Sequence, residues 1–298
     1  MFPSTAQVAF NPLQWFATED GWLDWSLAPA WPELMRQVKE AGFDAVHTRI
    51  PAGHTAAEYG RIIREAGLQP APGTFAFELA EDGGPSAEET VEAFRETARG
   101  YADLGLRHLF VIPAVLPDAP RAARPACGAE ADEARLDRIV TLLTAVSQAV
   151  VAEGVLPILH PHVGTWIETA EEARYVLDHI DASLLGFGPD VGHLTWAGAD
   201  PVELVEQYAD RVHGMHLKDL RRTVRDASVT EGRSYQETVA AGLWIEPGRG
   251  DIDYERIWAA LGEDWDGTLV IEVDKGDITP PLESAKACAR WVAEQRVR

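Results

Sequence analysis

The sequence predicts an α/β protein that folds as a single (β/α)8 TIM barrel over residues 1–298. Short apolar runs alternate with longer amphipathic ones along the whole chain, and repeated strand–helix units give parallel strands with right-handed crossovers. Eight apolar runs are present, which is the number that closes a barrel. No GxGxxG follows the first run, so an open dinucleotide-binding sheet is disfavoured.

The predicted strands are brief and rich in β-branched or aromatic residues, as strands buried on both faces should be. In chain order they are residues 8–15, 43–50, 69–77, 108–115, 156–162, 185–190, 213–217 and 268–273. Amphipathic helices are predicted between them, and several end at a glycine, a common helix terminator. The helices of this kind are 31–42, 56–67, 87–105 and 133–154.

Two segments depart from this alternation. Residues 117–133 form a Pro/Ala-rich loop, and residues 219–251 form an insertion between strands seven and eight. In a barrel that second position belongs to the rim of the active site. No linker separates these segments from the rest, so we expect one domain.

The composition excludes several classes of protein. The chain carries 48 Asp+Glu against 26 Lys+Arg, a net charge of −22, which repels nucleic acid and anionic membrane surfaces. Two cysteines, Cys127 and Cys288, are too few for a disulfide framework or a cysteine-ligated metal site. No apolar run approaches the roughly 20 residues of a membrane span, and the first residues lack the pattern of a secretion signal. We therefore expect a cytoplasmic enzyme.

Polar residues gather at the predicted carboxyl ends of four consecutive strands, where barrel enzymes build their active sites. They are His160, His162 and Glu168 after strand five, Asp190 and His193 after strand six, His216 and Lys218 on strand seven, and Glu272 on strand eight. Imidazole and carboxylate groups together suit a divalent transition metal, and an open coordination position makes such a site catalytic. Asp190, His216 and Glu272 are the candidate metal ligands.

Each of these residues also has an ordinary structural interpretation. A single histidine at a strand end is more often a hydrogen-bonded core residue than a ligand, and a single aspartate there is usually a helix cap. Glu168 directly precedes Thr169, which reads as the start of a helix over 169–180. The metal interpretation is favoured because the residues coincide on neighbouring strands, and because an unpaired Glu272 after a buried run would be costly.

Six stretches of the chain together resemble the xylose-isomerase-like TIM-barrel superfamily of sugar isomerases, epimerases and dehydratases, and within it the inosose dehydratase-like and 3-keto-sugar-acting members. The stretches are GFDAVHT (42–48), HPHVGTWIET (160–169), PDVGHL (189–194), HGMHLKDL (213–220), EPGRGDIDY (246–254) and LVIEVD (269–274). The resemblance covers essentially the whole chain and is specific for the superfamily, but much less so for one substrate.

The resemblance implies a divalent metal, with Mn²⁺ expected first and Mg²⁺, Co²⁺ or Zn²⁺ as alternatives. Asp190, His216 and Glu272 match the family's ligands on strands six, seven and eight, and His193 matches a histidine that contacts substrate. The epimerases place a glutamate after strand five, where this chain has His160-Pro161-His162. We expect Glu168 to supply the fourth ligand instead, with either histidine as the alternative.

Keto-sugar chemistry follows from this set of residues. The metal polarises a ketone and stabilises the enediolate that forms when an α-proton leaves. The candidate bases are His160, His162 and Glu168. Lys218 is expected to hold a substrate hydroxyl or oxyanion, or to return a proton, unless it is a rim lysine paired with Asp219. Trp15, Trp166 and Arg249 are further expected substrate contacts.

The leading hypothesis is thus a metal-dependent isomerase, epimerase or dehydratase, acting in carbohydrate metabolism on a sugar or cyclitol ketone. One alternative is a phosphodiesterase like the AP endonuclease IV barrels, although a trinuclear zinc site needs more ligands and DNA binding needs a basic face. Another is a non-catalytic barrel subunit of a complex that processes keto-glycosides. A homo-oligomer or a partner subunit is expected by analogy only.

Overall fold

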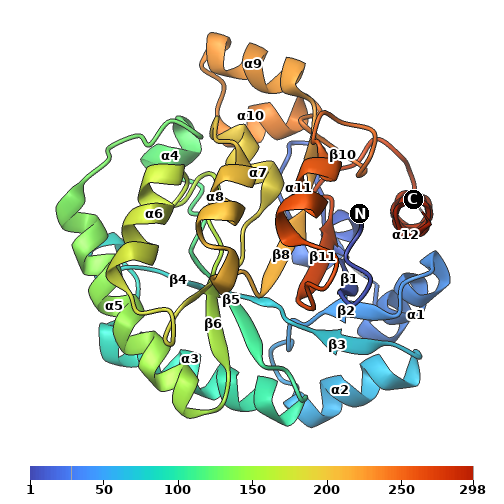
Figure 1. Ribbon diagram of the computed structural model, residues 1–298, viewed down its shortest axis with the longest axis horizontal. Helices are drawn as coiled ribbons and strands as arrows, with labels where there is room; N and C mark the ends of the chain where they lie inside the picture. The colour runs from blue at the N-terminus through green and yellow to red at the C-terminus, as the bar shows by residue number, and fades with distance from the viewer. Residues whose placement is uncertain (28, 298) are drawn as a thin grey trace.

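The computed structural model describes residues 1–27 and 29–297, so residues 28 and 298 of the predicted domain lie outside the described residues. A barrel of parallel strands is surrounded by helices, as predicted (Figure 1). The barrel strands are β1 (Gln7–Asn11), β2 (Ala45–His47), β3 (Gln69–Ala71), β4 (Thr74–Phe77), β5 (His108–Pro113), β6 (Leu156–Leu159), β7 (Gly186–Phe187), β8 (Gly214–Leu217) and β11 (Thr268–Glu272).

Two parallel sheets make up the barrel wall, in the orders β3-β2-β1-β11-β8 and β4-β5-β6-β7. Parallel bridges from Phe187 to Val212 and from Asp190 to His216 join β7 to β8 and close one seam. At the other seam the predicted strand 69–77 is two strands, with β3 paired to β2 and β4 paired to β5. The break falls at Gly73, where the Thr48 carbonyl comes so close that no side chain would fit.

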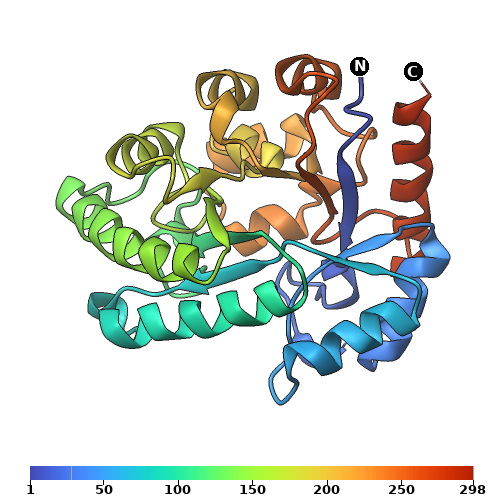
Figure 2. The same cartoon turned by 60° about the horizontal axis from the view of Figure 1, so that its bottom comes forward.

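Helices cover the outside of the barrel, and the two chain termini lie near each other on one side (Figure 2). Their bounds are α1 (Trp31–Ala41), α2 (Ala56–Glu65), α3 (Ala87–Asp103), α4 (Pro120–Ala123), α5 (Glu133–Ala152), α6 (Ala170–His179), α7 (Val191–Trp196), α8 (Pro201–Gln207), α9 (Arg222–Glu231), α10 (Tyr235–Ala240), α11 (Tyr254–Leu261) and α12 (Pro281–Arg296). Gly42, with φ of 112°, ends α1 in the left-handed conformation that the sequence predicted. None of the described helices is long and apolar enough to cross a membrane.

The predicted rim insertion contains α9, α10 and an antiparallel pair, β9 (Asp219–Leu220) and β10 (Trp244–Ile245). It packs over α7 through a second hydrophobic cluster that includes Trp196, Tyr235 and Trp244. Trp196 and Trp244 therefore belong to the packing of the rim.

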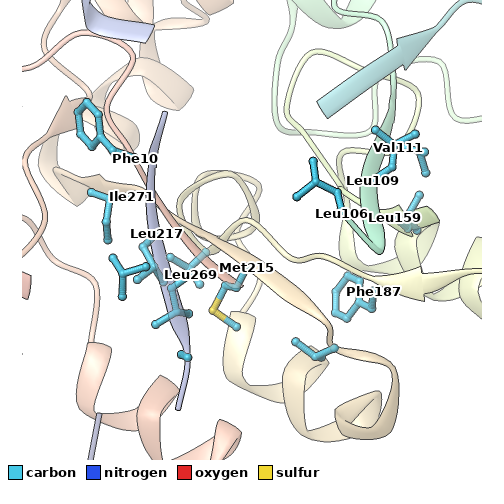
Figure 3. Packing of buried hydrophobic residues seen from close by; sticks show 14 of the residues in the cluster. Phe10, Leu106, Leu109, Val111, Leu159, Phe187, Met215, Leu217, Leu269 and Ile271 are labelled. Carbon is cyan, nitrogen blue, oxygen red and sulfur yellow. The ribbon is translucent and has the colours of Figure 1, made fainter. Parts of the chain in front are cut away.

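The inside of the barrel is filled largely by one aromatic ring. Phe110 on β5 is fully buried with Ile158 and Val270, and its ring lies under the carboxyl ends of the strands. Gly188 and Gly214 make room for it, since a Cβ atom there would lie 2.6 and 2.8 Å from the ring. Neighbouring strand residues point outward into the layer between strands and helices, where Leu109, Met215 and Leu269 are among those shown in Figure 3.

We predict that Gly214→Ala destabilises the protein by about 1–3 kcal/mol, because the added methyl overlaps Phe110 in a close-packed core. Denaturant unfolding measures the loss. The double variant Gly214→Ala with Phe110→Leu should recover part of it, since a smaller side chain makes room for the methyl. Strictly additive losses in the double variant would show that the two positions do not compete for space.

Candidate active site at the carboxyl ends of the strands

A cavity of about 950 Å³ opens at the carboxyl ends of β1, β2, β6 and β11. Its polar wall includes Asn11, His47, His160, His162, Glu272 and Asp274. Its apolar wall comes largely from the loop after β1 and includes Phe16, Trp22, Trp25 and Trp31. A cavity of this size, with polar groups converging at one end and aromatic rings at the other, suits a small polar molecule with a ring.

Lys218 lies behind the polar wall, in contact with Glu272 and Asp274, and has no exposed surface. Its Nζ lies 2.5 Å from Glu272 Oε1, 2.9 Å from Asp274 Oδ1 and 3.0 Å from His193 Nε2. Burial opposes its charge, but attraction to the carboxylates outweighs burial and places its pKa well above the usual range. Lys218 is fully buried against Glu272, Asp274 and His193 and does not line the cavity, so it positions carboxylates rather than contacting substrate, which corrects the predicted role. The alternative pairing with Asp219 is also wrong, since that carboxylate accepts backbone N–H groups.

The surroundings of Asp190 and Glu272 shift the pKa values of these two carboxyl groups in opposite directions. Burial raises the pKa of Asp190 to about 7, although Lys218, 3.9 Å away, acts in the other direction. Burial also favours the neutral form of Glu272, but its direct contact with Lys218 prevails and lowers its pKa to about 2. At neutral pH Glu272 is therefore a carboxylate, and Asp190 divides between its two forms.

His160 and His162 both present a ring nitrogen with a free lone pair. Their Nδ1 atoms lie 3.0 Å from the Gly188 carbonyl and 2.8 Å from the Val163 carbonyl. A carbonyl only accepts, so Nδ1 carries the proton and Nε2 of the neutral ring does not. Burial lowers the pKa of His160 to about 4 and that of His162 well below its usual value, so both rings are neutral.

His216 lies beneath the cavity, next to His160 and Glu272. Its ring centroid lies 4.3 Å from that of His160 and 4.4 Å from that of Phe110, and its Nε2 is 3.6 Å from Glu272 Oε2. The structure thus brings together Asp190, His216 and Glu272, as the sequence predicted, with His160 Nε2 4.0 Å from Asp190 Oδ2.

The donor atoms of Asp190, His216 and Glu272 are of the kinds that bind a divalent cation. Asp190 Oδ2 and both ring nitrogens of His216 are buried without a hydrogen-bond partner, a costly state that a bound cation would relieve. As the side chains stand, however, no three His, Cys, Asp or Glu residues of the described chain are gathered closely enough to hold a metal. A metal would have to compete with Lys218 for Glu272.

Glu168 does not join the group, which corrects its assignment as the fourth ligand. Its buried carboxylate accepts four backbone N–H groups, from Gly164 at 2.9 Å, Ala126 at 3.0 Å, Cys127 at 3.2 Å and Gly128 at 2.8 Å. Glu168 therefore anchors the Pro/Ala-rich loop. Among the residues after β6 that could bind a metal, His160 lies nearest to the predicted ligands.

Three predicted substrate contacts do not line the cavity either. Trp15 is buried in the core, where its Nε1 donates to Gln37 at 2.7 Å. Trp166 lies against Arg135 and donates to Asp82. Arg249 forms an ion pair with Glu246 at 2.6 Å.

His193 stands behind the cavity wall rather than in it. Its ring packs at 3.5 Å against that of His162, and its Nε2 contacts Lys218. It therefore supports His162 and does not reach substrate directly.

Sequence reasoning also missed several residues of the cavity wall, among them His47, Arg49 and Tyr235. His47 is the last residue of β2 and Arg49 follows it by two positions, so the rule that polar residues at strand ends face the site would have found them. Tyr235 comes from the rim insertion, and no local pattern marks its direction.

Comparisons with known proteins agree with this fold. A family model described as "Xylose isomerase-like TIM barrel" matches residues 35–295. An inosose dehydratase of Geobacillus kaustophilus is 28% identical over 254 residues, which cover 80% of this chain and 82% of that protein. The chain spans about half the length of inosose dehydratases from Clostridium botulinum that it matches at 33–34% identity.

Two solved structures illustrate the likeness in fold. A 3-keto-D-glucoside 4-epimerase from E. coli superposes with a TM-score of 0.67 at 15% identity, covering 97% of this chain and 99% of that one. The IOLI protein, solved with a bound zinc atom, superposes with a TM-score of 0.66 at 16% identity, covering 98% of each chain.

We predict that Glu168→Gln loosens the loop over 117–133 and costs about 1–3 kcal/mol, because an amide NH₂ cannot accept the N–H groups that the carboxylate oxygens accept. Hydrogen exchange and limited proteolysis should report faster opening of this loop. Glu171→Gln, on the exposed first turn of α6, is the matched control and should change neither. An unchanged loop in Glu168→Gln would contradict the anchoring role.

Asp190 should give the metal-free protein a pH-dependent stability. Its folded pKa of about 7 lies above the unfolded value, so its contribution is complete below about pH 4 and is lost as pH rises through 7. Asp190→Asn should therefore be more stable than the wild type at pH 7.5 in EDTA, by up to about 4 kcal/mol, with the difference vanishing near pH 4. Denaturant unfolding at both pH values measures this. Exposed Asp264→Asn is the control, and an Asp190→Asn variant less stable than wild type at pH 7.5 would refute the expectation.

Proposed function

Because this chain belongs to the xylose isomerase-like TIM barrel family, we propose that it is a metal-dependent lyase or isomerase of a sugar or cyclitol ketone. The observation that carries this proposal is the pair of neutral imidazoles, His160 and His162, on the wall of a cavity that also holds an ionised Glu272. Relatives named inosose dehydratase and a neighbour named 3-keto-D-glucoside 4-epimerase support ketone substrates of this kind.

Proton transfer next to a ketone is the chemistry that this wall can perform. A neutral imidazole with its lone pair on Nε2 can take an α-proton from a substrate in the cavity and return it or pass it on. His162 suits this role because its Nδ1–H is fixed by the Val163 carbonyl and its ring is held against His193. Reprotonation of the resulting enediolate gives an isomer or epimer, and loss of a β-hydroxyl gives a dehydrated product.

We propose that Asp190, His216 and Glu272 hold a divalent cation, with His160 as the additional donor in place of Glu168. The unpartnered atoms of Asp190 and His216 support this set, and the zinc atom of a structural neighbour supports a divalent ion. The ion supplies Lewis-acid stabilisation of negative charge on the substrate oxygen. Manganese is our first choice, with Mg²⁺, Co²⁺ and Zn²⁺ as the ions to compare.

Exchange of substrate protons in D₂O tests the reaction directly. Incubated with an inosose or a 3-keto-D-glucoside, the protein should incorporate deuterium next to the ketone, with or without loss of water, as followed by NMR. His162→Ala should retain its fold and metal but slow the exchange by about 10²- to 10⁴-fold. His179→Ala, exposed at the end of α6, is the control. Absence of exchange in the wild type with every divalent ion would defeat the proposal.

Metal analysis separates this function from its alternatives. We expect one equivalent of a divalent ion per chain, lost in Asp190→Asn and in Glu272→Gln but retained in Glu168→Gln. Three zinc equivalents would instead favour a phosphodiesterase of the AP endonuclease IV type, and no metal binding at all would favour a non-catalytic barrel.

A further inference from the structure

Arg49 stands in the same cavity as His47 but on the aromatic side. It follows His47 by two residues, and in an extended chain such residues lie on one side about 7 Å apart. Both line the cavity. A substrate whose ketone lies near His160 and Glu272 would therefore extend toward Arg49 with its other end.

The guanidinium of Arg49 is held in place by aromatic rings. Its carbon Cζ lies 3.7 Å from the centroid of Trp25, and Trp25 in turn packs against Phe16 at 4.4 Å. Both rings line the cavity as well. Stacking on the face of a ring leaves the N–H edge of an arginine free for planar recognition of an oxyanion.

Arg49 makes no ion pair and no side-chain hydrogen bond with any residue that the structure describes. Arg121 and Arg135, by contrast, each contact both oxygens of a carboxylate, in Glu172 and Asp82. Arg49 is exposed, so its guanidinium is open to a ligand that enters the cavity.

We propose that the substrate carries a carboxylate, which Arg49 binds through its paired N–H groups, so that the enzyme acts on a keto acid of the sugar or cyclitol class. The proposal rests on the proposed function for the choice of cavity. A carboxylate is favoured over a phosphate because Glu96, Glu272 and Asp274 line the same cavity and repel a dianion more strongly than a monoanion. The other nearby cation, Lys275, already contacts Glu19.

Binding of three matched probes tests this without any turnover. D-glucuronate, D-glucose and D-glucose 6-phosphate share a ring and differ in the group on its terminal carbon, so NMR titration compares carboxylate, hydroxyl and phosphate at one position. We expect the wild type to bind glucuronate at least ten-fold more tightly than glucose. Arg49→Gln should abolish that preference and Arg49→Lys should weaken it, because lysine keeps the charge but loses the planar fork.

The control is Arg107→Gln, which removes the same charge from an exposed arginine just before β5, at the opposite end of the barrel. It should leave the preference for glucuronate intact. A wild type that does not prefer glucuronate to glucose, a preference that survives in Arg49→Gln, or tighter binding of glucose 6-phosphate than glucuronate would each overturn the proposal. Because no reaction is involved, these outcomes are separate from a failure of the proton exchange with neutral ketones.

Discussion

The buried ammonium of Lys218 holds the candidate site together. Glu272 ends β11, Asp274 follows it by two residues, and both are buried, so they would repel each other without a cation between them. The parallel register supplies that cation, because Leu217 on β8 lies opposite Ile271 on β11 and the chain then continues to Lys218 and Glu272. Removing one partner from such a cluster leaves an uncompensated buried charge, which costs several kcal/mol. The geometry of the site thus follows from the pairing of these two strands.

The packing inside the barrel determines where along the barrel axis the cluster of Lys218, Glu272 and Asp274 lies. Phe110 fills the space beneath His160 and His216, and it fits only because Gly188 and Gly214 have no side chain. Water is thereby kept from the lower side of the imidazoles, and the same burial lowers the pKa values of both rings. Packing and chemistry are therefore coupled through one aromatic ring.

Strand order, the glycine ends of the helices and the gathering of polar residues at one edge could be predicted because each depends on local patterns along the chain. Glu168 could not be assigned in this way, since an acid before a helix gives no sign that backbone amides 40 residues earlier will surround it. The tryptophans after β1 posed a similar problem. Trp15 turns into the core while Trp25 lines the cavity, and an irregular loop has no periodicity to distinguish them. Lys218 was expected to contact substrate, and its burial among Glu272, Asp274 and His193 depends on distances between strands that no local pattern shows.

The Glu168 anchor also bears on the order of folding. The loop over 117–133 contains only one short helix, yet Glu168 and Arg121 tie it by hydrogen bonds to the segment that leads into α6. These bonds join residues about 40 positions apart in the chain, so they can form only after the segment that follows β6 has been made. During synthesis the loop leaves the ribosome well before its partners, and until they arrive it is an unprotected stretch of chain. The half-made protein is therefore most vulnerable to proteases at a segment that is well anchored once folding is complete.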